Sequence, residues 1–168
     1  MSTLRAQDRL QPALLDRLTD DDPGNPAEAV EMRIISRPRM REAVLRDLGW
    51  LFNTTFLSAS GVFDHFPEVK RSVLNYGLPA LSGQTISSID AVALEARVKA
   101  AIIDHEPRIL PDTLKVEAMV SDKQLDQHNQ LSFRISGQLW AQPVPLELLL
   151  QTNVDLETGQ VEIKNLTG

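Results

Sequence analysis

The sequence predicts an α+β domain, with three to four helices followed by an antiparallel four-stranded sheet packed against them. Apolar residues recur every three or four positions through the first two thirds of the chain, and from Leu114 onward they alternate with polar residues. Helices first and strands afterwards is an order typical of α+β proteins. A length of 168 residues, of which 42% are hydrophobic, suits one domain with a substantial core.

Residues 1–36 are predicted to hold an N-terminal helix and an acidic loop rich in proline and glycine, ahead of a single domain at 37–168. The leucines near the N-terminus stand near helical spacing, and Pro12 interrupts them, so a short helix is expected to begin there. Residues 20–26 combine aspartates with prolines and a glycine, and with Glu31 they faintly resemble a calcium loop. The glycine stands one position early and the prolines stiffen the backbone, which favours a solvated loop.

A longer amphipathic helix is predicted to begin at Ser36 or Arg37 and to continue through Asn53. Pro38 suits its first turn, where the missing N–H group of proline would have no partner in any case. A connection rich in turn-forming residues follows, with room for one or two helical turns at 66–74. The predicted apolar face of the helix consists of Met40, Val44, Leu48, Leu51 and Phe52.

Another helix is expected at 89–105. Ser87 or Ser88 can cap its N-terminus, and Pro107 stops it because proline disfavours helical geometry in the residue before it. We expect its core-facing side to be Ile89, Val92, Ala93, Ala96, Ala100 and Ile103.

Four strands are predicted in the last third of the chain, with a hairpin turn at 155–159 before the final strand at 161–165. The final strand would leave an edge whose unpaired backbone groups invite strand addition. The sequence does not indicate which edge of the sheet would accept a strand. The apolar sets are Leu114, Val116, Ala118 and Val120; Leu131, Phe133, Ile135, Gly137 and Leu139; Leu148, Leu150, Thr152 and Val154; and Val161 with Ile163.

Composition excludes several classes of function. The chain has no cysteine, which rules out disulfides, thiolate zinc sites, iron–sulfur clusters and cysteine nucleophiles. A net charge of −6 makes a nucleic-acid partner unfavourable. The N-terminus lacks the apolar stretch of a signal peptide, and no apolar run approaches the length of a spanning helix. We therefore expect a cytoplasmic protein with no direct membrane insertion.

No enzyme motif is present. His65, His105 and His128 have no second histidine at metal-ligand spacing, and nothing marks a nucleophile beside any of them. We expect them to be surface or loop-packing residues, and we expect no catalytic residue, metal or cofactor. Glu106 could in principle be the acid of a glycoside hydrolase, but that mechanism needs a second carboxylate that the sequence does not identify.

Two short segments are candidate partner-binding sites. In Glu106-Pro107-Arg108 the proline constrains two opposite charges. The tripeptide is either a helix stop with a local ion pair, or a rigid loop whose arginine engages an acidic surface on a partner. The second segment, Asn75-Tyr76-Gly77, is either a plain turn or a direct partner contact.

Several stretches together resemble the TssE family, the baseplate subunits of type VI secretion systems, which are related to the wedge protein at the foot of contractile phage tail sheaths. The matching stretches occur in the expected order over nearly the whole chain. They are LLDRL at 14–18, RDLGWLFNT at 46–54, PEV at 67–69, SVLNYGLP at 72–79, SG at 82–83 and EPR at 106–108.

The resemblance implies a structural role without enzymatic activity. TssE-like proteins join TssF and TssG in the wedges of a cytoplasmic baseplate docked at the inner membrane, with TssK and the spike complex as indirect partners. Their fold is similar to the strand-exchanging part of the sheath protein, so they are expected to start assembly of the TssB/TssC sheath. The tripeptide matched by Glu106, Pro107 and Arg108 is associated with contacts to the wedge core. The alternatives are a phage-tail wedge protein, an anti-adaptor-type binding module of the same fold and, least favoured, a muramidase.

Overall fold

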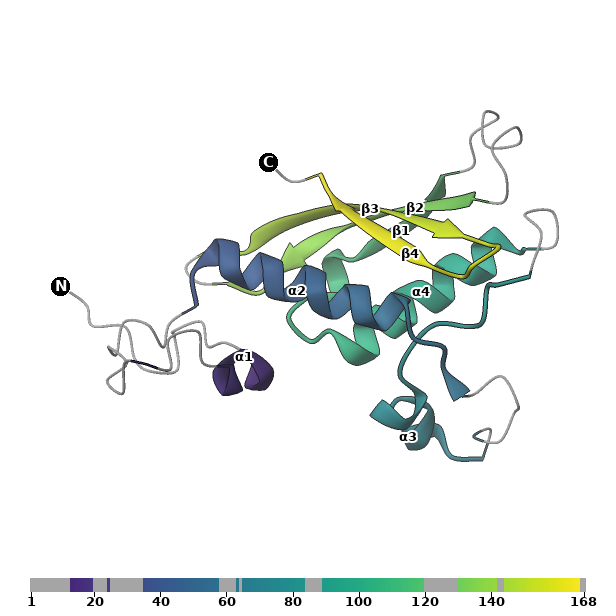
Figure 1. The fold of residues 1–168 in the computed structure, drawn as a ribbon, viewed down its shortest axis with the longest axis horizontal. Coiled ribbons are helices and arrows are strands. Elements are labelled where there is room, and N and C mark those ends of the chain that lie inside the picture. Colours follow the sequence, from purple (N-terminus) through teal and green to yellow (C-terminus); the bar gives the residue numbers. More distant parts are fainter. Residues whose placement is uncertain are drawn as a thin grey trace.

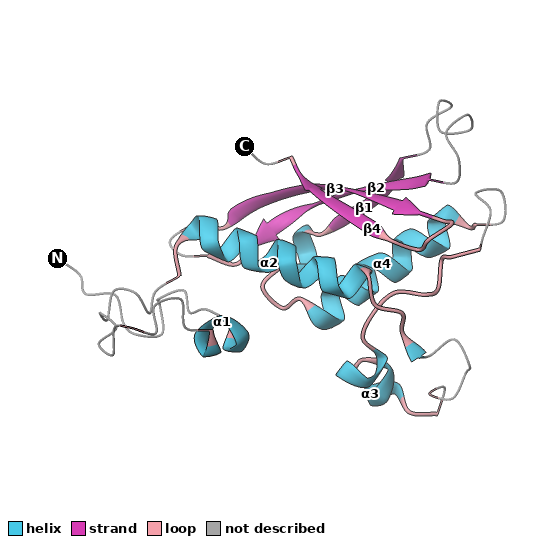
Figure 2. Ribbon diagram, viewed as in Figure 1, coloured by secondary structure: helices cyan, strands magenta, loops and turns pink. Residues whose placement is uncertain are grey.

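The computed structural model describes residues 13–19, 24, 35–57, 63, 65–83, 89–119, 130–141 and 144–166. Within them, two long helices lie across one face of an antiparallel sheet (Figures 1 and 2). The α+β class and the order of helices before strands are confirmed. Of the sequence predictions, residues 20–26 apart from Gly24, the caps Ser87 and Ser88, Val120 and His128 lie outside the described residues. No helix in the described part of the chain is long and apolar enough to span a bilayer.

The sheet is a meander in which each strand pairs with the next. Its strands are β1 (Lys115–Met119), β2 (Gln130–Leu139), β3 (Leu146–Asp155) and β4 (Val161–Asn165), in the spatial order β1-β2-β3-β4. The predicted turn between β3 and β4 is confirmed: Gly159 has a positive φ of 76°, which favours glycine. The Asp155 carboxylate accepts hydrogen bonds from the N–H groups of Glu157 and Thr158, which fixes the turn and so the register.

The predicted helices before the sheet are also present. They are α1 (Leu14–Leu18), α2 (Arg37–Phe52), α3 (Pro67–Lys70), the 3₁₀ turn η4 (Val73–Asn75) and α4 (Ala91–His105). Ser36 caps α2 by accepting a hydrogen bond from the N–H of Arg39, and Pro38 lies in the first turn. The predicted serine cap of α4 is wrong, because the side chain of Asp90 accepts from the N–H of Ala93 instead.

The predicted core face of α4 is wrong as well. The buried residues are Leu94, Val98 and Ile102, whereas Val92 is 74% exposed and Ile103 is also exposed. The helix carries two apolar stripes, and the sheet covers the one with large side chains four residues apart. Half of the stripe expected to face the core is alanine, so burying it would remove less apolar surface from water.

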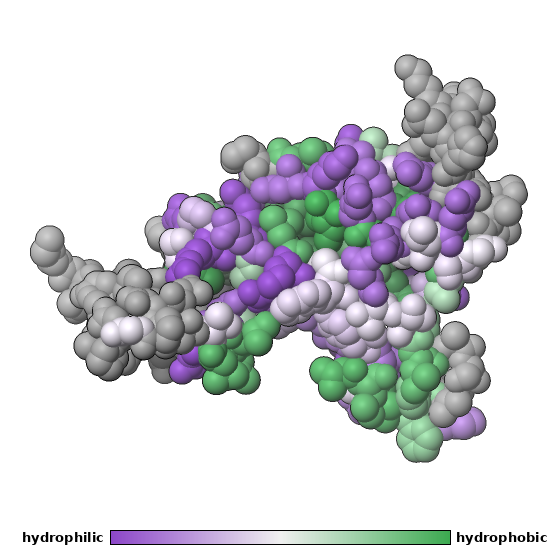
Figure 3. Space-filling model, in the orientation of Figure 1, coloured by the Kyte–Doolittle hydropathy of each residue, from purple (hydrophilic) through white to green (hydrophobic). Residues whose placement is uncertain are grey.

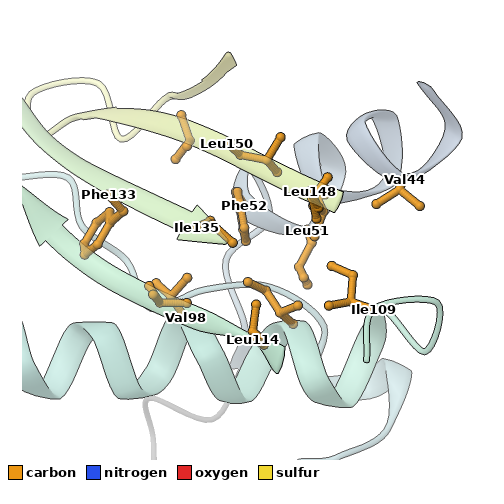
Figure 4. Close-up of a cluster of buried hydrophobic side chains, with 14 of the residues drawn as sticks. Val44, Leu51, Phe52, Val98, Ile109, Leu114, Phe133, Ile135, Leu148 and Leu150 are labelled. Atoms are coloured by element: carbon orange, nitrogen blue, oxygen red, sulfur yellow. The ribbon is translucent and has the colours of Figure 1, made fainter. Parts of the chain in front are cut away.

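The core fills the space between the helix layer and the sheet. Figure 4 shows side chains of α2, α4 and the strands meeting there, among them Leu51, Val98, Ile135 and Leu150. The predicted face of α2 is buried as expected, since Met40, Val44, Leu48, Leu51 and Phe52 are all core residues. The layered packing leaves the end of α4, and the loop that follows it, at the border of the core beside α2.

Candidate protein-interaction site

Five charged side chains form a continuous row of alternating charge, which we call the charge ladder. In spatial order they are Asp16, Arg46, Asp47, Arg108 and Glu106. Asp16 lies on α1, Arg46 and Asp47 lie on α2, and the other two follow α4. The ladder thus connects three helices that are distant in the sequence.

The inner end of the ladder is a bidentate pair between Glu106 and Arg108. Nε of Arg108 donates to Oε1 of Glu106 at 2.7 Å, and Nη2 donates to Oε2. The backbone N–H of Arg108 donates to the same carboxylate at 3.2 Å. Glu106 is only 3% exposed. The predicted local ion pair is therefore present, and it is largely buried rather than exposed.

Arg108 also reaches helix α2. Its Nη2 donates to Oδ2 of Asp47, a residue 61 positions away in the sequence. Burial by itself lowers the pKa of the Arg108 guanidinium, but its hydrogen bonds and charge interactions with Glu106 and Asp47 outweigh burial and raise that pKa above its usual range. Arg108 stays charged, and it ties the end of α4 to α2.

The backbone of the same loop continues the pairing of β2. The carbonyl of Arg108 accepts from the N–H of Trp140 at 2.7 Å, and the N–H of Leu110 donates to the carbonyl of Gln138 at 2.8 Å. Ile109 pairs antiparallel with Leu139 between these two bonds. The tripeptide is consequently held by α2 through side chains and by the central strand β2 through the backbone.

The outer end of the ladder attaches α1. Arg46 donates to Asp16 through Nη1, and to Oδ1 of Asp47 through Nε at 3.0 Å. The Arg46 guanidinium lies over the ring of Trp50, 5.0 Å from its centroid. The hydrogen bond from Arg46 holds the pKa of Asp16 below its usual value. The leucines of α1 point outward, with Leu18 73% exposed, so polar contacts rather than apolar burial link α1 to α2.

The segment Asn75-Tyr76-Gly77 lies beside the ladder. The Tyr76 hydroxyl donates to the backbone carbonyl of Asp47 at 3.3 Å, and its ring packs edge-on against His105 at 5.1 Å between centroids. Burial, followed by the charges of Asp47 and Glu106, raises the pKa of that hydroxyl. Asn75 donates to the carbonyl of Lys70 at 2.9 Å.

The backbone geometry of this segment requires glycine at position 77. The φ of Gly77 is 123°, and a Cβ there would lie 2.2 Å from the carbonyl oxygen of Thr54. The close approach allows Leu78 to donate to that carbonyl at 2.8 Å and to accept from Phe56 at 3.0 Å. The segment therefore forms an ordered turn that packs on α2. A direct contact with a partner stays a prediction for Asn75, Tyr76 and Gly77.

The structure brings the two candidate segments together at one residue, Asp47. Its carboxylate accepts a hydrogen bond from the guanidinium of Arg108, and its backbone carbonyl accepts one from the hydroxyl of Tyr76. Sequence reasoning missed Asp47, Arg46 and Asp16 as site residues. An available signal was the Arg-Asp pair at 46 and 47, which stands beside the apolar face of a helix where unpaired charges would be costly.

The surface around the ladder combines polar and apolar parts. Pro107 is exposed, and the side chain of Arg108 is 24% exposed. Figure 3 shows apolar surface over α1 and over the α3–η4 segment, where Phe66, Val73 and Leu74 are exposed. His105 is half-buried against Tyr76 and His65 is exposed, in keeping with the expectation for both. Among the described residues, no group of acidic or histidine side chains could hold a metal ion.

Comparison with known proteins supports a structural role. Searches of curated proteins and of solved structures found no significant match. Residues 38–144 match the family described as baseplate wedge protein gp25. The match runs from the first turn of α2 to just before β3, so it includes Asp47, Tyr76 and the tripeptide of the charge ladder. Because the match covers more than half of the chain, the protein belongs to the gp25 family of structural baseplate wedge proteins.

Proposed function

We propose that this chain is a TssE-type subunit of a type VI secretion baseplate, which joins TssF and TssG in a wedge and supports assembly of the TssB/TssC sheath. TssK and the spike complex would be indirect partners, at a cytoplasmic baseplate docked to the inner membrane. One observation supports a partner contact at the tripeptide. The charge ladder holds Pro107 at the surface in a loop that is fixed on both sides.

The ladder also refines how the tripeptide would meet a partner. Nε and Nη2 of Arg108 are used by Glu106 and Asp47, which leaves Nη1 as the guanidinium nitrogen without a hydrogen bond to the described residues. Arg108 would therefore mainly position the loop, and only its outer edge would reach an acidic group of TssF or TssG. Pro107 would supply the rigid apolar contact, because proline loses little conformational entropy on binding.

Co-expression tests this part of the proposal. The tagged chain should co-elute with TssF and TssG from the same genome in size-exclusion chromatography. Pro107→Ala should reduce co-elution without lowering the melting temperature, whereas the matched change Pro111→Ala, at an exposed proline four residues further along, should not. If the wild-type chain elutes alone, the TssE assignment fails. If the wild-type chain co-elutes and Pro107→Ala co-elutes equally well, the tripeptide is not the contact.

Sheath initiation would use the outer edge of β4. The even-numbered residues of β4 point their backbone N–H and carbonyl groups toward β3. This follows because the carbonyl of Gln160 accepts from the N–H of Asp155, and the N–H of Leu166 donates to the carbonyl of Leu149. The backbone groups of Ile163 therefore point away from the sheet, where an added strand could pair with them. Helices pack against both edge strands, α4 against β1 and α2 against β4, so this packing does not select one edge.

Proline substitutions separate the two edges. Proline is tolerated where its missing N–H would face away from the sheet, so Ile163→Pro should leave the β3–β4 bonds in place and remove a donor for an added strand. We expect this variant to lose initiation in a TssB/TssC polymerisation assay, while Val116→Pro on the outer edge of β1 retains it. Circular dichroism establishes that both variants fold. Equal initiation by both variants would refute the assignment to β4.

A type VI apparatus and a phage-tail particle both use a wedge protein, and membership of the gp25 family fits both. The genes beside this one discriminate between the two. Neighbouring TssF-like and sheath genes support type VI secretion, whereas neighbouring tail-fibre and capsid genes support a phage-tail wedge.

A further inference from the structure

Both edge strands have backbone groups that point away from the sheet. On each edge strand, a side chain from outside the sheet forms hydrogen bonds with such groups of one residue. On β1, the N–H of Ala118 donates to Oε1 of Glu95 at 2.6 Å. Even-numbered residues of β2 point their backbone toward β1, as the bonds of Gln138 and Trp140 to residues 108–113 show. In the observed register, Ala118 lies opposite the odd-numbered Phe133, so its N–H faces away from the sheet. Glu95 of α4 therefore occupies a donor that an added strand would use.

The β4 edge has the equivalent arrangement with an amide. The N–H of Val161 donates to Oδ1 of Asn53 at 2.9 Å, and Nδ2 of Asn53 donates to the carbonyl of Val161 at 3.0 Å. One side chain thus makes both hydrogen bonds that a residue of a neighbouring strand would make. Asn53 is the residue that ends α2, and its Nδ2 also donates to the carbonyl of Gly49 at 2.8 Å.

We propose that Asn53 and Glu95 are edge guards, which keep the sheet from pairing with the sheet of a second copy of this chain. Exposed strand edges pair readily with one another, and proteins protect them with side chains placed on the edge. The helix-ending role of Asn53 needs only its bond to Gly49, and it does not account for two further bonds to one residue of an edge strand. The inference does not rest on the proposed function: it concerns the same β4 edge, but in the isolated chain.

The geometry specifies the pairing that the guards prevent. Two β4 strands can pair antiparallel about a two-fold axis at Ile163, with Ile163 opposite its copy. Asn53 occupies the outward N–H and carbonyl of Val161 in each copy, two residues from the centre of this pairing. Removing the amide frees these two groups of Val161 in each copy.

Sedimentation of the purified full chain tests the proposal at β4. Asn53→Ala should self-associate reversibly, at least about tenfold more strongly than the wild type, because it frees two hydrogen-bonding groups on each copy. The matched control is Thr54→Ala, which removes a similar bond from Thr54 to the carbonyl of Trp50 at the same helix end and keeps the Asn53 side chain that binds Val161. Hydrogen exchange locates the contact, since the N–H of Val161 should remain protected in the associated variant. A folded Asn53→Ala chain that stays monomeric, with that N–H exchanging fast, overturns the proposal.

The β1 edge provides an independent test should Asn53→Ala fail to fold. Glu95→Ala should self-associate through β1, whereas Glu95→Gln should remain monomeric because its amide oxygen can still accept from Ala118. Protection of the Ala118 N–H in the associated Glu95→Ala chain would support the guard role. Monomeric behaviour of Glu95→Ala, or equal association of the two Glu95 variants, would overturn it.

Discussion

The two ends of the charge ladder use the same chemistry in different surroundings. At the inner end, Glu106 is buried and bound to Arg108 through two nitrogens of the guanidinium. At the outer end, Arg46 is one-third exposed and holds Asp16 on a helix of five residues. Ion pairs in water contribute little, whereas removing one partner of a buried pair is costly. Loss of one partner should therefore cost more at the inner end than at the outer end, which only positions α1.

The strongest test of this difference is Glu106→Ala. It leaves the Arg108 guanidinium largely buried with one carboxylate instead of two, and we expect a loss of about 3–5 kcal/mol in the free energy of unfolding. Chemical denaturation measures it, with Glu68→Ala on the exposed surface of α3 as the control for loss of a carboxylate. A loss under about 1 kcal/mol would place the Glu106 pair in the same class as an exposed one.

Asp47→Asn should be the next largest change. The amide keeps the shape of the side chain and removes the charge that faces both arginines, so a loss of about 1–3 kcal/mol is expected. A double-mutant cycle with Glu106→Gln shows whether the two carboxylates act together on Arg108. If the two losses in the free energy of unfolding are strictly additive, the two carboxylates act on Arg108 independently.

Tyr76→Phe tests the bond between the 75–77 turn and α2. The hydroxyl bond to the carbonyl of Asp47 is neutral and 3.3 Å long, so its removal should cost about 0.5–1.5 kcal/mol. Thermal unfolding measures the change. A neutral result would indicate that the ring and Gly77, rather than the hydroxyl, hold the turn in place.

The smallest effect is expected at Asp16. Its pKa is lowered in the folded state, so its contribution is present above the ordinary aspartate pKa of about 3.9 and is lost as pH falls through the lower folded value. We expect less than about 1 kcal/mol, because the pair is partly exposed. Trp50 lies under Arg46, so its fluorescence should change on acidification in the wild type and not in Asp16→Asn. Identical titrations of the two proteins would contradict the link.

The fold could be predicted from the sequence because local periodicity determines it. Alternation located all four strands, and the Pro38 signal located the start of α2. The exposed stripe of α4 shows where periodicity alone fails. Two apolar stripes of similar width compete there, and only contact with the sheet selects Leu94, Val98 and Ile102.

The site was predictable only in part. Glu106, Pro107 and Arg108 are adjacent in the chain, so their ion pair could be anticipated from the sequence. The bond from Arg108 to Asp47 could not, because it joins residues 61 positions apart whose approach depends on how α2 and α4 pack. The same holds for Asn53, whose bonds to Val161 depend on the position of the last strand.

The backbone pairing of residues 108–110 with the end of β2 has a mechanical consequence. Tension applied to the loop along the direction of β2 would load these hydrogen bonds in shear. Hydrogen bonds in shear share the load and break together, unlike bonds peeled apart one after another. The exposed Pro107 is therefore attached to the centre of the sheet in an orientation that resists pulling along β2.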